Sequence, residues 1–151
     1  MSVPRRSPPA DAASIEGEVP FHDVDPLRIV WHGNYYKYLE IARTALFRRH
    51  AIDGLELLEL GYRFVVSHSE CRHVNPLTYG DRYRVSAWFL DVEQRVNVGY
   101  EVWDLTHERR AARARTELVT TDADGGLLLE TPTVIRDRIA TAVGASEAGT
   151  R

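Results

Sequence analysis

The stretch from His22 to Tyr35 (HDVDPLRIVWHGNY) holds the residues of this chain whose types and order are best suited to chemistry. Asp25 precedes a proline that fixes the backbone, and a short apolar run then leads to His32, at the entrance to a segment with helical periodicity. A carboxylate can act as a nucleophile or a base, and unpaired N–H groups at a helix start can stabilise an oxyanion. The stretch therefore predicts attack on a carbonyl carbon.

The flanking sequence predicts the elements that position this stretch. Alternation predicts a half-buried strand over residues 15–22, and apolar residues at i, i+3, i+4 and i+7 predict an amphipathic helix over residues 34–50, with Asn34 as its N-cap. A short helix is expected at 54–60, a last strand segment at 127–131 and a short helical end at 132–139. Four long strands bounded by turn residues are expected at residues 63–74, 81–92, 95–104 and 111–121.

The order of these elements predicts an α+β fold in which one long helix covers one face of a twisted antiparallel sheet. We expect one domain over residues 15–139, preceded by a disordered lead (residues 1–14) and followed by a flexible tail (residues 140–151).

Composition excludes several classes of function. The net charge of −3 gives no overall attraction to nucleic acid or to an anionic membrane, and no apolar run is long enough to span a bilayer. Cys71 is the only cysteine, so no intramolecular disulfide can form. We expect a cytoplasmic protein with neither a nucleic-acid nor a membrane partner.

Three runs of residues resemble the hotdog-fold acyl-CoA thioesterases of the 4-hydroxybenzoyl-CoA thioesterase type, over residues 15–139. These runs are Asp23-x-Asp25-Pro26-x-x-Ile29-Val30-Trp31-His32-x-Asn34-Tyr35, Tyr38-x-Glu40-x-Ala42-Arg43, and Asn75-Pro76-x-x-Tyr79-Gly80-Asp81. The resemblance implies a hotdog fold, with an antiparallel sheet wrapped around the long helix.

The resemblance also implies a function and a set of site residues. It implies hydrolysis of an acyl thioester, carried by CoA or by acyl carrier protein, without a metal or an organic cofactor, in a homodimer or homotetramer. Asp25 matches the catalytic carboxylate, and His32 matches a position whose backbone N–H polarises the thioester carbonyl. The expected substrate contacts are Arg28, which stands where the family usually has glycine, together with Val30, Trp31, Tyr35 and Arg95.

Alternatives to these roles exist for individual residues. Asp25 could be only a turn former before Pro26, and Asp23 is expected to be a solvated or capping residue. Glu40 and Arg43 have the spacing of a helix-surface ion pair. A metal site at His68, Glu70, Cys71 and His73 is disfavoured, because alternation along a strand lets at most two of them face one ion.

Two other classes of function stay open. A hotdog-fold dehydratase of hydroxyacyl thioesters would need a histidine paired with an acid on the helix, for which His32 and Glu40 are the candidate pair. A non-catalytic protein that binds acyl thioesters would bind substrate analogues without turning them over.

Overall fold

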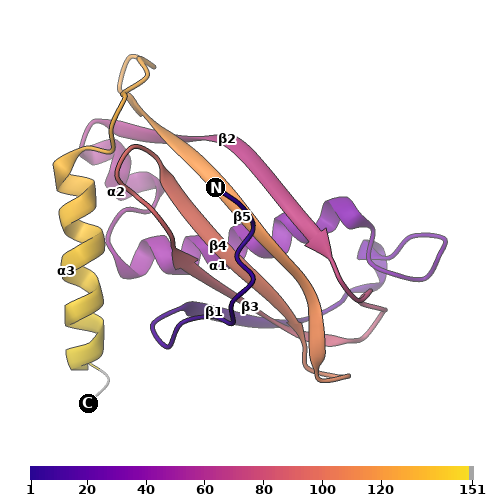
Figure 1. The fold of residues 1–151 in the computed structure, drawn as a ribbon. Coiled ribbons are helices and arrows are strands. Elements are labelled where there is room, and N and C mark those ends of the chain that lie inside the picture. The colour runs from indigo at the N-terminus through magenta and orange to yellow at the C-terminus, as the bar shows by residue number, and fades with distance from the viewer. Residues whose placement is uncertain (150–151) are drawn as a thin grey trace.

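One long helix lies against one face of a curved antiparallel sheet, as the sequence predicts (Figure 1). The computed structural model describes residues 1–149, and the side chains of residues 1–141. The helix is α1 (Tyr35–Arg49), which is followed by the short α2 (Gly54–Glu59). The strands are β1 (Ala13–Glu18), β2 (Tyr62–His73), β3 (Arg82–Phe89), β4 (Val96–Asp104) and β5 (Arg109–Asp122).

The strands run in the order β1-β3-β4-β5-β2, and each is antiparallel to its neighbours. β3, β4 and β5 are consecutive in the chain and adjacent in the sheet, because short turns connect antiparallel neighbours. β2 precedes them in the chain but lies at the far edge of the sheet. Residues 74–81 must therefore carry the chain from this edge to β3, and they pass close to the stretch that contains Asp25.

The core lies between α1 and the face of the sheet that we call the inner face. Tyr100 on β4 stands opposite Ala87 on β3 and Ala114 on β5, and all three are fully buried. On α1, Leu39 and Leu46 point into this layer and are no more than 2% exposed. Each buried leucine contributes roughly 2 kcal/mol by leaving water. This burial fixes α1, and with it the helix start where the candidate site lies.

The N-terminal segment differs from the disordered lead that was predicted. Residues 1–12 form neither helix nor strand, but Val3 is buried and Pro4 packs against Gly99 on the opposite, outer face of the sheet. Figure 1 shows the segment crossing the sheet on the side away from α1. Arg49 at the end of α1 also donates a hydrogen bond to the carbonyl of Asp11. Composition alone did not predict these contacts, because the sheet face that they cover is assembled from distant strands.

The ends of two predicted elements also differ from the sequence prediction. β1 ends at Glu18, and the last residues of the predicted strand form a 3₁₀ turn instead, Phe21–Asp23. The segment at 127–131 forms only an isolated bridge between Leu127 and Thr121.

At the C-terminus, α3 (Thr133–Gly149) is longer than the predicted helical end and continues through most of the predicted flexible tail. Residues 150–151 of that tail lie outside the described residues. No helix in the described part of the chain is both long enough and apolar enough to cross a membrane.

Candidate active site

Asp25 begins a tight turn in the segment between β1 and α1, which we call the Asp25 loop (residues 20–35). The carbonyl of Asp25 accepts a hydrogen bond from the N–H of Arg28 at 2.8 Å, and the N–H of Asp25 donates to the carbonyl of Ile29 at 2.9 Å. The Asp25 carboxylate accepts the N–H of Leu27 at 2.8 Å. Arg28 has a φ of 66°, in the left-handed region that glycine adopts most easily. The backbone shape expected of a glycine is thus kept here by an arginine.

Asp23 anchors the Asp25 loop to the start of α1. Its side chain is 3% exposed and accepts hydrogen bonds from Lys37 Nζ and from the Tyr38 hydroxyl, both at 2.6 Å. Its backbone carbonyl accepts the N–H of Trp31 and the side-chain amide of Asn34. The prediction that Asp23 is a solvated or capping residue is therefore wrong.

The pKa of Asp23 reflects this setting. Burial alone raises it, but the hydrogen bonds from Lys37 and Tyr38 outweigh burial, so the pKa lies below its ordinary value. Burial raises the pKa of Tyr38, and the hydrogen bond to Asp23 raises it further. Asp23 is therefore a charged anchor, and each of its carboxylate oxygens already accepts a strong hydrogen bond.

The start of α1 differs in detail from the prediction. A 3₁₀ turn, His32–Asn34, runs directly into α1, so the helical stretch begins at His32. Asn34 is the N-cap residue of α1, as predicted, but it has helical dihedral angles and its side chain makes no capping hydrogen bond. Within residues 1–149, the backbone N–H groups of His32 and Gly33 have no hydrogen-bond acceptor. They are therefore free to bind a ligand oxygen at the positive end of the helix dipole.

The turn before β3, residues 75–81, holds the Asp25 loop from the other side. The carbonyl of Leu77 accepts the N–H of Val30 at 2.8 Å, and Thr78 forms a bridge with Ile29. The carboxylate of Asp81 accepts both the N–H and the hydroxyl of Thr78, at 2.8 and 3.0 Å. These bonds fix the position of Thr78 and, through it, the strand-like part of the Asp25 loop.

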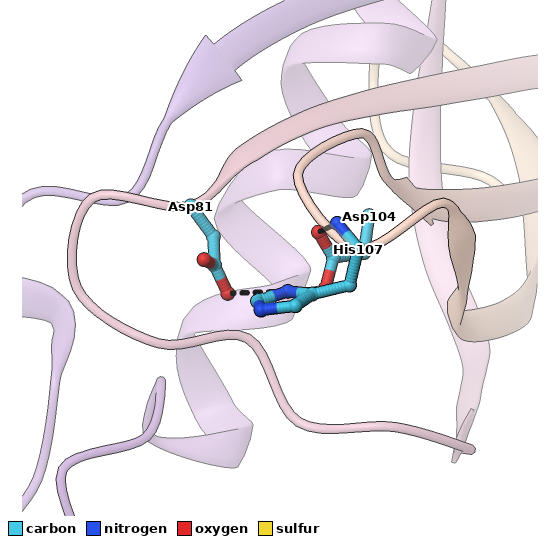
Figure 2. Close-up of side chains that lie close together, drawn as sticks. All are labelled: Asp81, Asp104 and His107. Carbon is cyan, nitrogen blue, oxygen red and sulfur yellow. Dashed lines mark hydrogen bonds and ion pairs between the residues drawn. The ribbon is translucent and has the colours of Figure 1, made fainter.

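Asp81 also belongs to a cluster with Asp104, which is buried like Asp81, and with His107, which is exposed. Figure 2 shows the imidazole of His107 lying between the two carboxylates, with Nδ1 at 2.9 Å from Asp104 and 3.8 Å from Asp81. Within residues 1–149, this is the group of three whose ligand atoms lie close enough together, within 4.8 Å, to hold one metal ion. In the structure, each member is instead hydrogen-bonded to the protein, so the cluster supports the turn below the Asp25 loop.

Asp25 and His32 line one pocket of about 420 Å³, which we call the Asp25 pocket. The pocket also brings together Val30 and Tyr35, two of the predicted substrate contacts. Its remaining lining comes from the Asp25 loop and from the end of β2 with the turn that follows it: Leu27, Ile29, His73, Val74, Asn75 and Pro76. Asp25, the start of the helical stretch at His32 and an apolar wall therefore line one space.

His73 is a pocket residue that the sequence reasoning did not identify as one. Its ring lies edge-on to Tyr35 with the ring centres 4.7 Å apart, and 6.4 Å from the ring centre of His32. Partial burial lowers the pKa of His73, and the nearby His32 lowers it further. From the sequence, His73 was considered only as a metal ligand that shares a strand face with Cys71, and the register shows that this is the inner face.

Three predicted substrate contacts do not line the Asp25 pocket. Arg28 is not a lining residue although its neighbours Leu27 and Ile29 are, and Trp31 is 49% exposed and packs over Gly33. Arg95 directly precedes β4 and pairs with Glu117 at 2.9 Å. It therefore lies at one end of the sheet, whereas the end of β2 that lines the pocket lies at the other end. Within the described residues, none of these three side chains therefore lines the pocket that Asp25 lines.

The alternative pairings also have definite positions. Glu40 is exposed and lies 3.9 Å from Arg43, as expected of a surface pair, but Arg43 is mostly buried and also reaches the hydroxyl of Tyr100. Glu40 lines a separate groove between α1 and β2, and so does not share the Asp25 pocket with His32.

The candidate metal ligands on β2 are divided between two faces. Strand register places His68 and Glu70 on the outer face and Cys71 and His73 on the inner face, as predicted. Burial raises the pKa of Cys71 to about 11, which keeps the thiol protonated and unreactive.

Comparison with known proteins places this geometry in a family. A model of the thioesterase-like superfamily matches residues 19–139. An Aquifex aeolicus protein assigned as an esterase is 31% identical over 67 residues, covering 44% of this chain and 52% of that protein. The Bacillus subtilis protein YneP, assigned as an acyl-CoA thioesterase, is 29% identical over 90 residues, which cover 59% of this chain and 65% of YneP. The matches thus span about half to two thirds of these relatives.

Solved structures agree on the fold. A Thermus thermophilus thioesterase, determined with coenzyme A and zinc, has a TM-score of 0.72 and 27% identity, covering 89% of this chain and 95% of that one. A DHNA-CoA thioesterase from Staphylococcus aureus has a TM-score of 0.75 and 18% identity, covering 93% and 95%. The hotdog fold is therefore confirmed, and since the family model matches most of its length, the chain belongs to the thioesterase-like superfamily.

Proposed function

We propose that the protein hydrolyses an acyl thioester in the Asp25 pocket, releasing a free acid and a thiol. One observation carries the proposal: Asp25 lines the same pocket as His32, where the helical stretch begins with backbone N–H groups that have no acceptor. The carboxylate would act on the carbonyl carbon while the N–H groups stabilise the oxyanion. Membership of the superfamily and the similarity to YneP support this reaction.

Two routes are chemically balanced for Asp25. In the first, a carboxylate oxygen attacks the thioester carbon, the C–S bond breaks, the thiolate leaves and takes a proton, and water then hydrolyses the mixed anhydride. In the second, Asp25 takes a proton from a water molecule, whose oxygen attacks the carbon directly; the C–S bond then breaks, and the leaving thiolate takes a proton. Neither route needs a metal or an organic cofactor.

The assembly that we propose is a homodimer or a dimer of dimers. β2 is an edge strand with unpaired backbone groups, and Val65 and Val66 on it are 49% and 46% exposed. Pairing of this edge with a second copy would cover both features and close the nearby groove between α1 and β2. Sedimentation would show a dimer or tetramer, whereas a monomer that is fully active at nanomolar concentration would contradict this assembly. We place the enzyme in the cytoplasm.

The test is a thiol-release assay with short, long and aromatic acyl groups on CoA and on acyl carrier protein. We expect release of free thiol from saturated acyl thioesters, which a dehydratase would not produce. Binding of the thioesters without any release would instead favour a non-catalytic binding protein. Single turnover in heavy-oxygen water identifies the first route if the first product carries no label, while a labelled product is compatible with both.

A further inference from the structure

Two arginines stand directly opposite each other on the outer face of the sheet. Arg72, near the end of β2, is the register partner of Arg113 on β5. Both side chains point away from α1, because their neighbours Cys71 and His73 on β2 and Ala112 and Ala114 on β5 belong to the inner face. Arg72 is exposed and Arg113 is half-buried.

Other outer-face arginines nearby have carboxylate partners, whereas these two do not. Arg115 contacts Glu70 at 3.3 Å, and Arg110 contacts Glu101 at 3.0 Å. Within the described residues, no carboxylate lies within ion-pair distance of Arg72 or Arg113. Like charges directly opposite on neighbouring strands destabilise a sheet. On its other side, Arg113 stands opposite Glu101 of β4, but the carboxylate of Glu101 pairs with Arg110 instead. The two guanidinium groups therefore have no ion-pair partner of their own and are open to an anion.

The pair lies beside the rim of the Asp25 pocket. Val74 and Asn75 line the pocket, and both donate their N–H groups to the carbonyl of Ala111, at 2.8 and 3.1 Å. Arg72 is two residues before Val74 and Arg113 is two residues after Ala111, so each lies about 7 Å along its strand from this rim. A long substrate whose reacting end lies in the pocket can cross the rim and reach both guanidinium groups.

We infer that Arg72 and Arg113 bind the phosphates of the CoA nucleotide, so that the enzyme selects free CoA thioesters over thioesters on carrier protein. The inference rests on the proposed function, since it assumes that the reacting end of the substrate occupies the Asp25 pocket. Guanidinium groups suit this ligand because they donate several hydrogen bonds to phosphate oxygens and stay charged at any working pH. Free CoA carries a pyrophosphate and a 3′-phosphate, whereas the prosthetic group of a carrier protein carries one phosphodiester.

The test compares one acyl group on CoA and on pantetheine, which lacks all phosphates. The acyl group is the one hydrolysed fastest in the thiol-release assay. We expect Arg72→Gln and Arg113→Gln each to raise KM for the CoA thioester about tenfold, with kcat nearly unchanged, and to leave the pantetheine thioester unaffected. High salt should weaken the wild-type preference for CoA in the same direction.

The matched control is Arg63→Gln, which removes the same charge from the same strand and the same outer face, nine positions earlier. It should leave both substrates unaffected. Thermal unfolding adds a second readout: because repulsion is removed, Arg72→Gln should melt no lower than the wild type without ligand. A lower melting temperature, with equal losses on both substrates, would make Arg72 a structural residue and overturn the inference.

Other outcomes separate this inference from the proposed function. Equal kcat/KM for the CoA and pantetheine thioesters in the wild type would overturn the inference and leave the hydrolase standing. Faster hydrolysis of the carrier-protein thioester would overturn the selection of free CoA. If no thioester releases thiol, the proposed function fails, and calorimetry with CoA itself then decides: unchanged affinity in Arg72→Gln and Arg113→Gln overturns the phosphate site, and about tenfold weaker binding supports it.

Discussion

Asp23 and Asp25 are two residues apart in the same loop and have opposite surroundings. Asp23 is buried, pairs with Lys37 and Tyr38, and has its backbone carbonyl bonded as well. Asp25 is half-buried, faces the Asp25 pocket, and accepts a single hydrogen bond on its carboxylate, from Leu27. Each carboxylate oxygen of Asp23 already accepts a strong hydrogen bond, which makes Asp23 a poorer nucleophile and base than Asp25. Our proposal therefore assigns anchoring to Asp23 and chemistry to Asp25.

The strongest test of this division is Asp25→Asn. The change keeps the size of the side chain and removes its charge, so turnover of an acyl thioester should fall by about two to four orders of magnitude. The free energy of unfolding should change little, because one exposed hydrogen bond is involved. Steady-state thiol release together with denaturant unfolding would measure both. Near-normal turnover in the folded variant would make Asp25 a turn residue.

Asp23→Asn should have the converse effect. It leaves Lys37 without its carboxylate and weakens the bond from Tyr38, so the free energy of unfolding should fall by about 2 kcal/mol. Urea unfolding of this variant beside Asp25→Asn, its matched control in the same loop, would measure the contrast. Equal stability of the two variants would mean that Asp23 is not the anchor of the loop.

The same contrast should depend on pH. Since the folded-state pKa of Asp23 lies below its ordinary value of about 3.9, the ionised group contributes stability above that value and loses it as the pH falls through the folded-state pKa. The stability difference between the wild type and Asp23→Asn should therefore be constant from about pH 5 to 7 and shrink at lower pH. A difference that grows on acidification would contradict this account.

The contacts of Asp23 show where sequence reasoning reaches its limit. Asp25 could be identified because its motif is local, and the periodicity of α1 and the later strands is local too. The burial of Asp23 depends on Lys37 and Tyr38, one helix turn inside α1, and no spacing rule predicts that the loop folds back onto them. His73 enters the pocket from β2, which is distant in the sequence, so its role was equally hidden.

His32→Ala is expected to cost less than Asp25→Asn. The proposed oxyanion donors are the backbone N–H groups at His32 and Gly33, which the substitution retains, and the ring of His32 is exposed. We expect kcat to fall by no more than about tenfold. The same thiol-release assay measures it. A loss as large as that of Asp25→Asn would show that the imidazole itself takes part, and His73→Ala would then test whether the neighbouring ring orients it.

The smallest effect is expected at Arg28, in the turn that begins with Asp25. Its φ of 66° costs an L-amino acid about 1 kcal/mol relative to glycine, although glycine also gains freedom in the unfolded chain. Arg28→Gly should therefore change the stability by less than about 1 kcal/mol, in the stabilising direction. Arg28→Ala is the matched control, because it removes the side chain and keeps the strain.

Since Arg28 does not line the Asp25 pocket, the acyl-chain profile should stay the same in both variants. A broader profile in both would instead place the arginine side chain over the substrate, and a change in Arg28→Gly alone would assign the effect to the backbone of the turn that presents Asp25.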